Sequence, residues 1–162
     1  MPSFDIVSKV DAQSLDNAIN SARKEIQTRY DFRGSNTTIE LDKKTSTVHI
    51  VTENEMKIDA IQDIIISRMI KQGLDVKSLD FGKEQYASGQ MVKKDIKIKE
   101  GIDKEAARKI IKAIKDLKLK VEPAQMDEQV RVSGKKLDDL QAAMGAVRKG
   151  DFGIAVQFVN FK

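Results

Sequence analysis

Residues 58–62 of the chain, Ile-Asp-Ala-Ile-Gln, recur as Leu-Asp-Asp-Leu-Gln at residues 137–141. Two shorter matches follow in the same order: Ala-Arg-Lys at residues 22–24 and 107–109, and Asp-Phe-Gly at residues 80–82 and 151–153. Matching stretches in a constant order indicate an internal duplication. The 162 residues therefore predict two small domains, which we place at residues 1–88 and 89–162.

The apolar residues around these repeats alternate at strand spacing in some stretches and recur at helical spacing in others. The expected strands are residues 4–10, 38–41, 47–52, 76–81, 91–99, 119–121, 129–133 and 154–161. The first expected helix has Ser14 as its N-cap and runs to about Arg29, and the second ends before Gly73. The third is capped by Asp103, and the fourth starts at Leu137 and stops at Gly150. Pro123 should lie at a sheet edge or in a turn.

Each half therefore has the order strand, helix, strand, strand, helix, strand. This order is typical of the ferredoxin-like α+β fold, in which both helices cover one face of a four-stranded antiparallel sheet. The other face can bind a ligand, pack on the sister unit or face water.

The composition excludes several kinds of site. Without Cys and with one His, the chain offers no disulfide or thiolate metal site, and we expect neither a metal nor a cofactor. It has no glycine-rich phosphate loop, and its Asp-Phe-Gly triplets lack the other motifs of a protein kinase. We therefore expect no catalytic residues and no enzyme. The lack of cysteine, of a signal segment and of a long apolar run favours a cytoplasmic protein outside the membrane.

The connector at residues 29–35, Arg-Tyr-Asp-Phe-Arg-Gly-Ser, is a candidate binding segment. Arg29 and Arg33 can form forked hydrogen bonds to phosphate, and Tyr30 and Phe32 can stack on a base. Alternatively, both aromatic side chains fill the core beneath the helix while both arginines are solvated.

The net charge of +4 suits an anionic partner. Arg108 and Lys112, with Lys109 and Lys115, form a basic stripe on the third helix, which either follows a phosphate backbone or is a solvated surface. On the open sheet faces, the aromatic stacking residues of an RNA-recognition sheet are missing. Phosphate contacts there by Lys9, His49 or Arg131 stay possible.

The chain closely resembles the bacterial YajQ family over its full length. The resemblance is carried by residues 1–8, 16–18, 29–35, 39–41, 71–73 and 156–161. It implies two ferredoxin-like domains that exchange their N-terminal strands, so that residues 4–10 complete the second sheet and residues 91–99 the first. It also implies binding of a purine nucleotide, such as GTP, ATP or cyclic di-GMP, or of RNA including tRNA. No family motif assigns the binding residues.

We therefore expect a non-catalytic protein that binds a purine nucleotide or RNA through cationic and aromatic side chains. The alternative is an adaptor that contacts a transcription or signalling protein through its exposed sheet faces. Of the oligomeric states, the monomer is favoured.

Overall fold

The computed structural model describes all 162 residues and divides into two compact units. Residues 10–99 form the first, which we call the continuous unit. Residues 1–9 and 100–162 form the second, which we call the split unit. The predicted α+β architecture, with two antiparallel sheets and four long helices, is confirmed. No helix has the length and hydropathy needed to cross a membrane.

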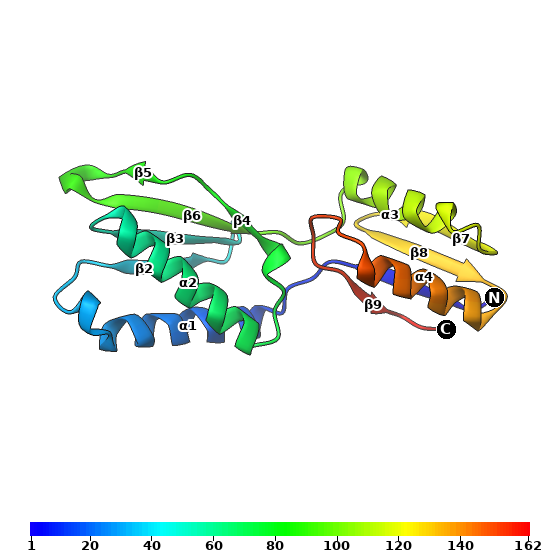
Figure 1. Cartoon of the computed structure of the whole chain (residues 1–162), viewed down its shortest axis with the longest axis horizontal. Helices are drawn as coiled ribbons and strands as arrows, with labels where there is room; N and C mark the ends of the chain where they lie inside the picture. The colour runs from blue at the N-terminus through cyan, green and yellow to red at the C-terminus, as the bar shows by residue number, and fades with distance from the viewer. The chain divides into compact units, whose positions relative to one another are not determined.

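In the continuous unit, helices α1 (Ala12–Thr28) and α2 (Glu55–Lys71) lie side by side on one face of the sheet (Figure 1). The sheet order is β2 (Thr38–Asp42), β3 (Thr47–Thr52), β6 (Val92–Ile98) and β4 (Leu79–Phe81), and β5 (Gln85–Tyr86) also pairs with β6. Ile58, Ile61 and Ile65 recur at helical spacing on α2 and are fully buried. They pack with β3 residues such as Val48 and Ile50, so the core lies between the helices and the sheet.

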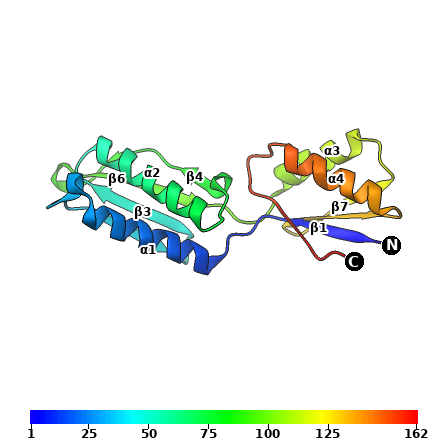
Figure 2. The same ribbon diagram turned by 60° about the horizontal axis from the view of Figure 1, so that its bottom comes forward.

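In the split unit, helices α3 (Lys104–Asp116) and α4 (Leu137–Lys149) cover one face of a four-stranded sheet (Figure 2). The sheet order is β7 (Val121–Met126), β8 (Gln129–Gly134), β1 (Ser3–Val7) and β9 (Gln157–Val159). The core joins Phe4 and Ile6 of β1 to Ile110 and Ile114 of α3. Pro123 lies in β7, an edge strand, as predicted.

Both units have the ferredoxin-like strand order, with β6 in the continuous unit at the position that β1 holds in the split unit. Their registers correspond: His49 of β3 lies opposite Asp95 of β6, and Arg131 of β8 lies opposite Asp5 of β1. This correspondence aligns the two units residue by residue.

Two of the sequence matches that predict the duplication, those of residues 58–62 and 80–82, are out of register with this alignment. Helix α2 begins at Glu55 and α4 at Leu137, so Ile58 corresponds to Leu140 and not to Leu137. Burial agrees, because Ile58 and Leu140 are buried whereas Leu137 is 64% exposed. Likewise, residues 80–81 lie in β4, whereas residues 151–153 precede β9.

Several expected element boundaries were also wrong. The strand expected at residues 119–121 is β7, which runs over Val121–Met126, and the strand expected at residues 4–10 ends at Val7. The N-cap of α1 is Asp11, whose carboxylate accepts hydrogen bonds from the backbone and hydroxyl of Ser14 at 2.9 and 2.7 Å. The strand expected from residue 76 starts at Leu79, because Val76–Ser78 form a short 3-10 helix capped by Asp75. The last strand is limited to Gln157–Val159, and Asn160 has a positive φ of 57°.

Candidate functional site

The connector between α1 and β2 contains a short 3-10 helix, η1 (Tyr30–Phe32), that separates its two aromatic side chains. Phe32 is 5% exposed and belongs to the core, whereas Tyr30 is 86% exposed. The core-filling alternative therefore holds for Phe32 and is wrong for Tyr30. The guanidinium carbon of Arg33 lies 5.9 Å from the centre of the Tyr30 ring, which is cation–π distance.

The two arginines of the connector differ in their partners. Arg29 forms a fork with Asp31, with Nε–Oδ1 and Nη2–Oδ2 distances of 2.9 Å. Their hydrogen bonds lower the pKa of Asp31 and raise the pKa of Arg29. Arg33 has no carboxylate partner. Arg33 and Tyr30 are thus the side chains of this segment that remain available to a ligand.

The connector also covers the N-terminus of α2. The Asn36 backbone N–H donates to Glu53 Oε1 at 3.1 Å, and Lys57 Nζ lies 3.3 Å from the same oxygen. Hydrogen bonds from Ser35, Lys57 and Asn36 lower the pKa of Glu53. Asn54 caps the helix by accepting from the Lys57 backbone N–H at 2.8 Å. We call the place where this connector meets the start of α2 the corner of the unit, and in the continuous unit it is closed by these hydrogen bonds.

His49 and Arg131 hold corresponding positions on the two open sheet faces, and each pairs with a carboxylate. His49 Nδ1 lies 2.7 Å from Asp95 Oδ1. Arg131 donates to both oxygens of Asp5, at 2.9 and 3.3 Å. Asp5 is 1% exposed and also accepts from Asn160 Nδ2 at 2.8 Å. The hydrogen bonds from Arg131 lower the pKa of Asp5 against the opposing effect of burial.

Lys9 lines a cavity of about 450 Å³ in the split unit that also contains Glu100, Asp127 and Glu128. Three carboxylates against one ammonium group make this cavity unfavourable for a phosphate.

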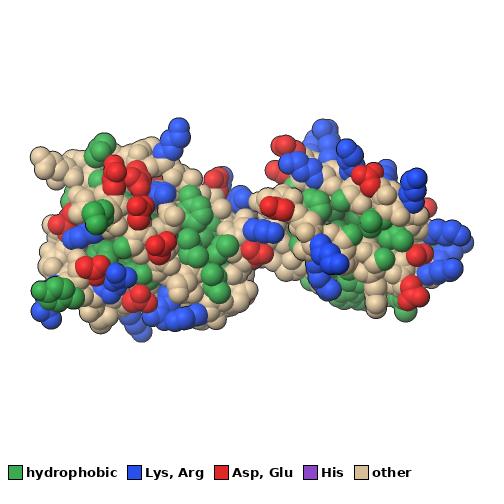
Figure 3. Space-filling view, in the orientation of Figure 1, with side chains coloured by type: hydrophobic (Ala, Val, Ile, Leu, Met, Phe, Trp, Pro, Cys, Tyr) green, Lys and Arg blue, Asp and Glu red, His purple; other side chains and the backbone are tan.

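The predicted basic stripe lies on the exposed surface of α3. Arg108, Lys112 and Lys115 are exposed and form no ion pair, whereas Lys109 lies 4.0 Å from Glu105. With a rise of about 1.5 Å per residue, the three unpaired cations span about 10 Å of the helix. Figure 3 shows lysine and arginine side chains gathered over α3 and at the end of the split unit that Figure 1 marks as N.

The predicted site residues thus fall in two groups. The continuous unit holds Arg29, Tyr30, Phe32 and Arg33, which are close together, and His49, which is not part of that cluster. The split unit holds Lys9, Arg131, Arg108 and Lys112. Within that unit, Lys9, Arg131 and the cations of α3 lie in three separate places and share no cavity. No group of three or more His, Cys, Asp or Glu side chains is arranged to hold a metal ion.

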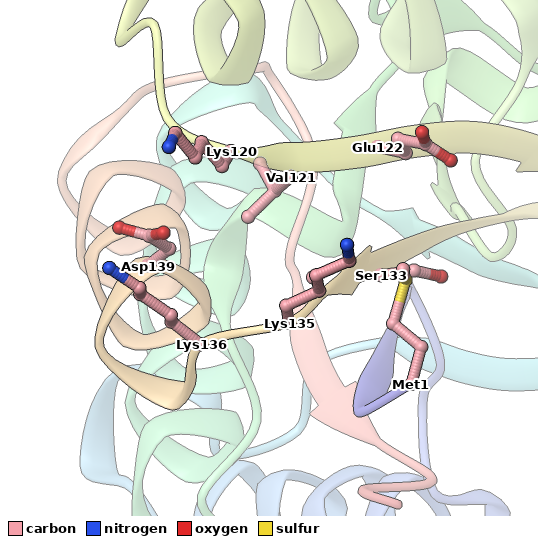
Figure 4. Close-up of a pocket in the computed structure, with 9 residues that line it drawn as sticks. Met1, Lys120, Val121, Glu122, Ser133, Lys135, Lys136 and Asp139 are labelled. Atoms are coloured by element: carbon pink, nitrogen blue, oxygen red, sulfur yellow. The ribbon is translucent and has the colours of Figure 1, made fainter.

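A cavity of about 430 Å³ lies in the split unit where β7, the end of β8 and the start of α4 meet. Lys120, Lys135 and Lys136 line it, and we call it the lysine pocket. Figure 4 shows Lys120 and Lys136 beside Asp139 on one side and Lys135 on the other, with Val121 projecting between them. The remaining lining residues are Met1, Glu122, Ser133 and Gly134.

The charge of the lysine pocket favours an anion. Its three lysines outnumber its two carboxylates, Asp139 and Glu122, and none of the lysines forms an ion pair. In Figure 4 the Glu122 carboxylate points away from the lysines, whereas Asp139 lies beside two of them. Unpaired ammonium groups form strong charge-assisted hydrogen bonds with phosphate oxygens. Val121 and Met1 add apolar surface, and the volume falls in the range of about 300–1,000 Å³ that is usual for small-molecule sites. The pocket can therefore hold a phosphorylated small molecule.

Two local features of the chain shape the pocket. A Cβ atom at Gly134 would lie 3.0 Å from Val121 Cγ1 and 3.3 Å from the Lys120 carbonyl oxygen, so glycine allows β7 and β8 to approach closely there. Lys136 is the N-cap of α4 but makes no side-chain capping bond, unlike Asp11, Asn54 and Asp103 at the other long helices. The start of α4 is therefore uncovered.

Sequence reasoning missed this pocket, because Lys120 lies just before β7 and the pair Lys135–Lys136 lies just after β8, at the open end of their hairpin. The available signal was the register of that hairpin, in which Val121 pairs with Gly134 and so places the lysines together.

Comparison with known proteins identifies the family of this chain. The model of the family "Nucleotide-binding protein YajQ-like" matches residues 2–162. A "nucleotide-binding protein" of Cytophaga hutchinsonii is 62% identical over 162 residues, covering 100% of both chains. Proteins with the same description from Oleidesulfovibrio alaskensis and Bacillus cytotoxicus are 49% and 46% identical and cover at least 99% of this chain and 97% of their own. The chain belongs to the YajQ-like nucleotide-binding protein family.

Proposed function

We propose that this protein binds a purine nucleotide without chemical conversion, and that the lysine pocket holds the phosphate groups. The observation that carries the proposal is the convergence of Lys120, Lys135 and Lys136, all without ion-pair partners, on one cavity of about 430 Å³. The relatives described as nucleotide-binding proteins support the ligand class. GTP, ATP and cyclic di-GMP are the nucleotides that the family resemblance implies.

Lysine side chains suit this task because the chain has no glycine-rich phosphate loop. Phosphate must then be held by side-chain cations and by individual backbone N–H groups. The three ammonium groups come from the residue just before β7 and from the segment between β8 and α4, so they can surround a polyphosphate from two sides.

The test is a calorimetric titration of GTP, ATP and cyclic di-GMP into the whole chain and two triple variants. Lys120→Gln/Lys135→Gln/Lys136→Gln removes the lysine pocket, and we expect at least a tenfold loss of affinity. Lys24→Gln/Lys44→Gln/Lys71→Gln is the control, because it removes the same charge from exposed positions without ion pairs in the continuous unit. Equal losses in both variants, or no nucleotide binding by the original chain, would contradict the proposal. Recovery of unchanged nucleotide after long incubation tests the absence of turnover.

RNA binding is a second candidate function, and the unpaired Arg108, Lys112 and Lys115 on α3 favour it. A row of cations can follow a phosphate backbone, and its affinity then falls steeply with salt because counterions are released. We expect Arg108→Ala/Lys112→Ala to weaken RNA binding and to reduce its salt dependence, while nucleotide affinity stays unchanged. An unaltered salt dependence in this variant would exclude α3 as the RNA surface.

A further inference from the structure

A second cavity, of about 360 Å³, lies beside the first turn of α4 in the split unit. We call it the apolar pocket, because most of its lining is hydrophobic: Phe4, Leu137, Leu140, Met144 and Phe161, with Gln141 as a polar neighbour. Leu137 and Phe161 are 64% and 60% exposed. Large apolar side chains with this much contact with water, around a cavity, indicate a binding surface.

The lysine pocket and the apolar pocket share the same turn of α4. Lys136 and Asp139 line the first, and Leu137 and Leu140 line the second. Residues three apart lie on one face of a helix, and successive residues are turned by about 100°, so these pairs form two adjacent stripes. The two pockets therefore lie on neighbouring faces of the same helical turn.

The start of the chain links the pockets on their other side. Met1 lines the lysine pocket, and Ser3 and Phe4 line the apolar pocket. The Pro2 carbonyl between them accepts a hydrogen bond from the Gly134 backbone N–H at 3.1 Å, which fixes this segment to the end of β8. Both pockets are therefore built on one rigid part of the split unit.

Phe161 is held in position to stack on an aromatic ligand. One side of its ring lies against Phe4, with centroids 6.3 Å apart and an interplanar angle of 27°. Two backbone hydrogen bonds between Ser3 and Lys162, at 3.2 and 3.0 Å, fix the adjoining segment. A ring whose position is already fixed loses little conformational entropy when a base stacks on it. The exposure of Phe161 shows that much of this ring is still uncovered.

Gln141 supplies the polar group that a base requires. Its side chain lines the apolar pocket, is exposed and has no hydrogen-bond partner in the protein. An amide group offers both a donor and an acceptor, as the polar edge of a nucleobase does.

We infer that the apolar pocket receives the base of the nucleotide, stacked on Phe161 and contacted at its polar edge by Gln141. The inference rests on the proposed function, in which the phosphates of the same nucleotide lie in the lysine pocket. The site then spans the first turn of α4, with phosphates on one side and the base on the other.

The experiment compares GTP with inorganic tripolyphosphate, which carries the phosphates without a base, by calorimetry on the whole chain. We expect the original protein to bind GTP at least tenfold more tightly than tripolyphosphate, since base stacking adds affinity. Phe161→Ala and Leu137→Ala should remove this difference and leave tripolyphosphate binding unchanged. Ile70→Ala, at a 58% exposed position in the continuous unit, is the control and should keep it. Leu137→Ala and Gln141→Ala decide the result if Phe161→Ala proves unstable.

Each outcome separates the inference from the proposed function. Equal affinities for GTP and tripolyphosphate would overturn the base site, while dependence of both on the three lysines would leave the lysine pocket standing. A preference for GTP that survives both Phe161→Ala and Leu137→Ala would also overturn it, because the base would then bind elsewhere. Failure of both ligands to bind would overturn the proposed function and the inference together.

Discussion

The two units build the same corner of the ferredoxin-like fold in opposite ways. In the continuous unit, Glu53 binds the connector and Asn54 caps α2, so the corner is closed. The corresponding residues of the split unit are Lys135 and Lys136, which line a pocket and cap nothing. Residues 29–37 join α1 to β2, whereas only residues 117–120 join α3 to β7. The longer connector closes one corner, and the shorter one leaves the other open to a ligand.

The open sheet faces differ in a similar way. Asp95 and His49 form an exposed pair in the continuous unit, with both side chains more than 40% accessible. At the corresponding positions of the split unit, Asp5 is buried beneath Arg131 and Asn160. The two pairs thus hold corresponding positions, but the carboxylate is exposed in the His49–Asp95 pair and buried in the Arg131–Asp5 pair.

The largest expected effect distinguishes these two pairs. Arg131→Ala leaves the buried Asp5 carboxylate without its cation. Because Arg131 itself is 40% exposed, we expect the split unit to lose about 2–3 kcal/mol, less than for a fully buried pair. His49→Ala at the corresponding exposed position should change stability by less than about 1 kcal/mol. Hydrogen exchange of β1, β3, β6 and β8 in increasing urea measures both units separately. Equal effects of the two substitutions would contradict the difference in burial.

The next largest effect concerns the close approach at Gly134, where the continuous unit has Thr52. Gly134→Val would force new carbon atoms against Val121 and Leu140, because both side chains lie within 3.3 Å of the position that a Cβ atom would take there. We expect a loss of about 1–3 kcal/mol by overpacking, together with weaker nucleotide binding. Gly145→Ala, in the open middle of α4, is the control and should stabilise by up to about 1 kcal/mol. Thermal unfolding and GTP titration measure both effects. Equal behaviour of Gly134→Val and Gly145→Ala would contradict the close packing at Gly134.

Substitution of the capping residues should have a smaller effect. In the split unit it should raise stability and lower the affinity for GTP. Lys136→Asn gives α4 the kind of cap that Asn54 gives α2, and we expect it to stabilise the split unit by about 0.5–1 kcal/mol. The same change removes one cation from the lysine pocket and should weaken GTP binding. Asn54→Ala should destabilise the continuous unit by about 1 kcal/mol and leave GTP binding unchanged. Tighter GTP binding by Lys136→Asn would be inconsistent with the proposed site.

The smallest effect is expected in acid. The folded pKa of Asp5 lies below its ordinary value of 3.8, chiefly because of the hydrogen bonds from Arg131. A depressed carboxyl pKa adds stability above the unfolded value, and this stability is lost as the pH falls through the folded value. The split unit should therefore weaken below about pH 4, and Asp5→Asn should reduce this acid sensitivity. Unfolding followed by circular dichroism between neutral and acidic pH measures the difference, and equal acid sensitivity in the original chain and Asp5→Asn would contradict it.

Most of the fold could be predicted because apolar periodicity is a strong local signal. The buried positions Ile58, Ile61 and Ile65 recur at helical spacing, and Val48 and Ile50 alternate as a strand requires. The letter matches between the halves were less informative than the order of elements. A short sequence match within a helix can be displaced by about one turn, because apolar residues recur at that spacing. For this reason Leu137 was matched to Ile58, whose structural equivalent is Leu140.

The candidate site was harder to predict because it depends on tertiary packing. Tyr30 and Phe32 stand in the same connector, and no periodicity there distinguishes the exposed ring from the buried one. Arg131 looked available on an open face, but its partner Asp5 lies 126 residues away in sequence. The lysine pocket requires the register of the β7–β8 hairpin, which brings Lys120 beside Lys135.

The central position of β1 has a consequence for the order in which the protein folds during synthesis. A ribosome makes β1 well before its partners β8 and β9, which follow only at residues 129–134 and 157–159. The continuous unit needs nothing beyond residue 99 and can fold while the rest of the chain is still being made. Residues 3–7 stay an unpaired strand until β8 and β9 have been made, so a strand synthesised before the continuous unit is paired only after it.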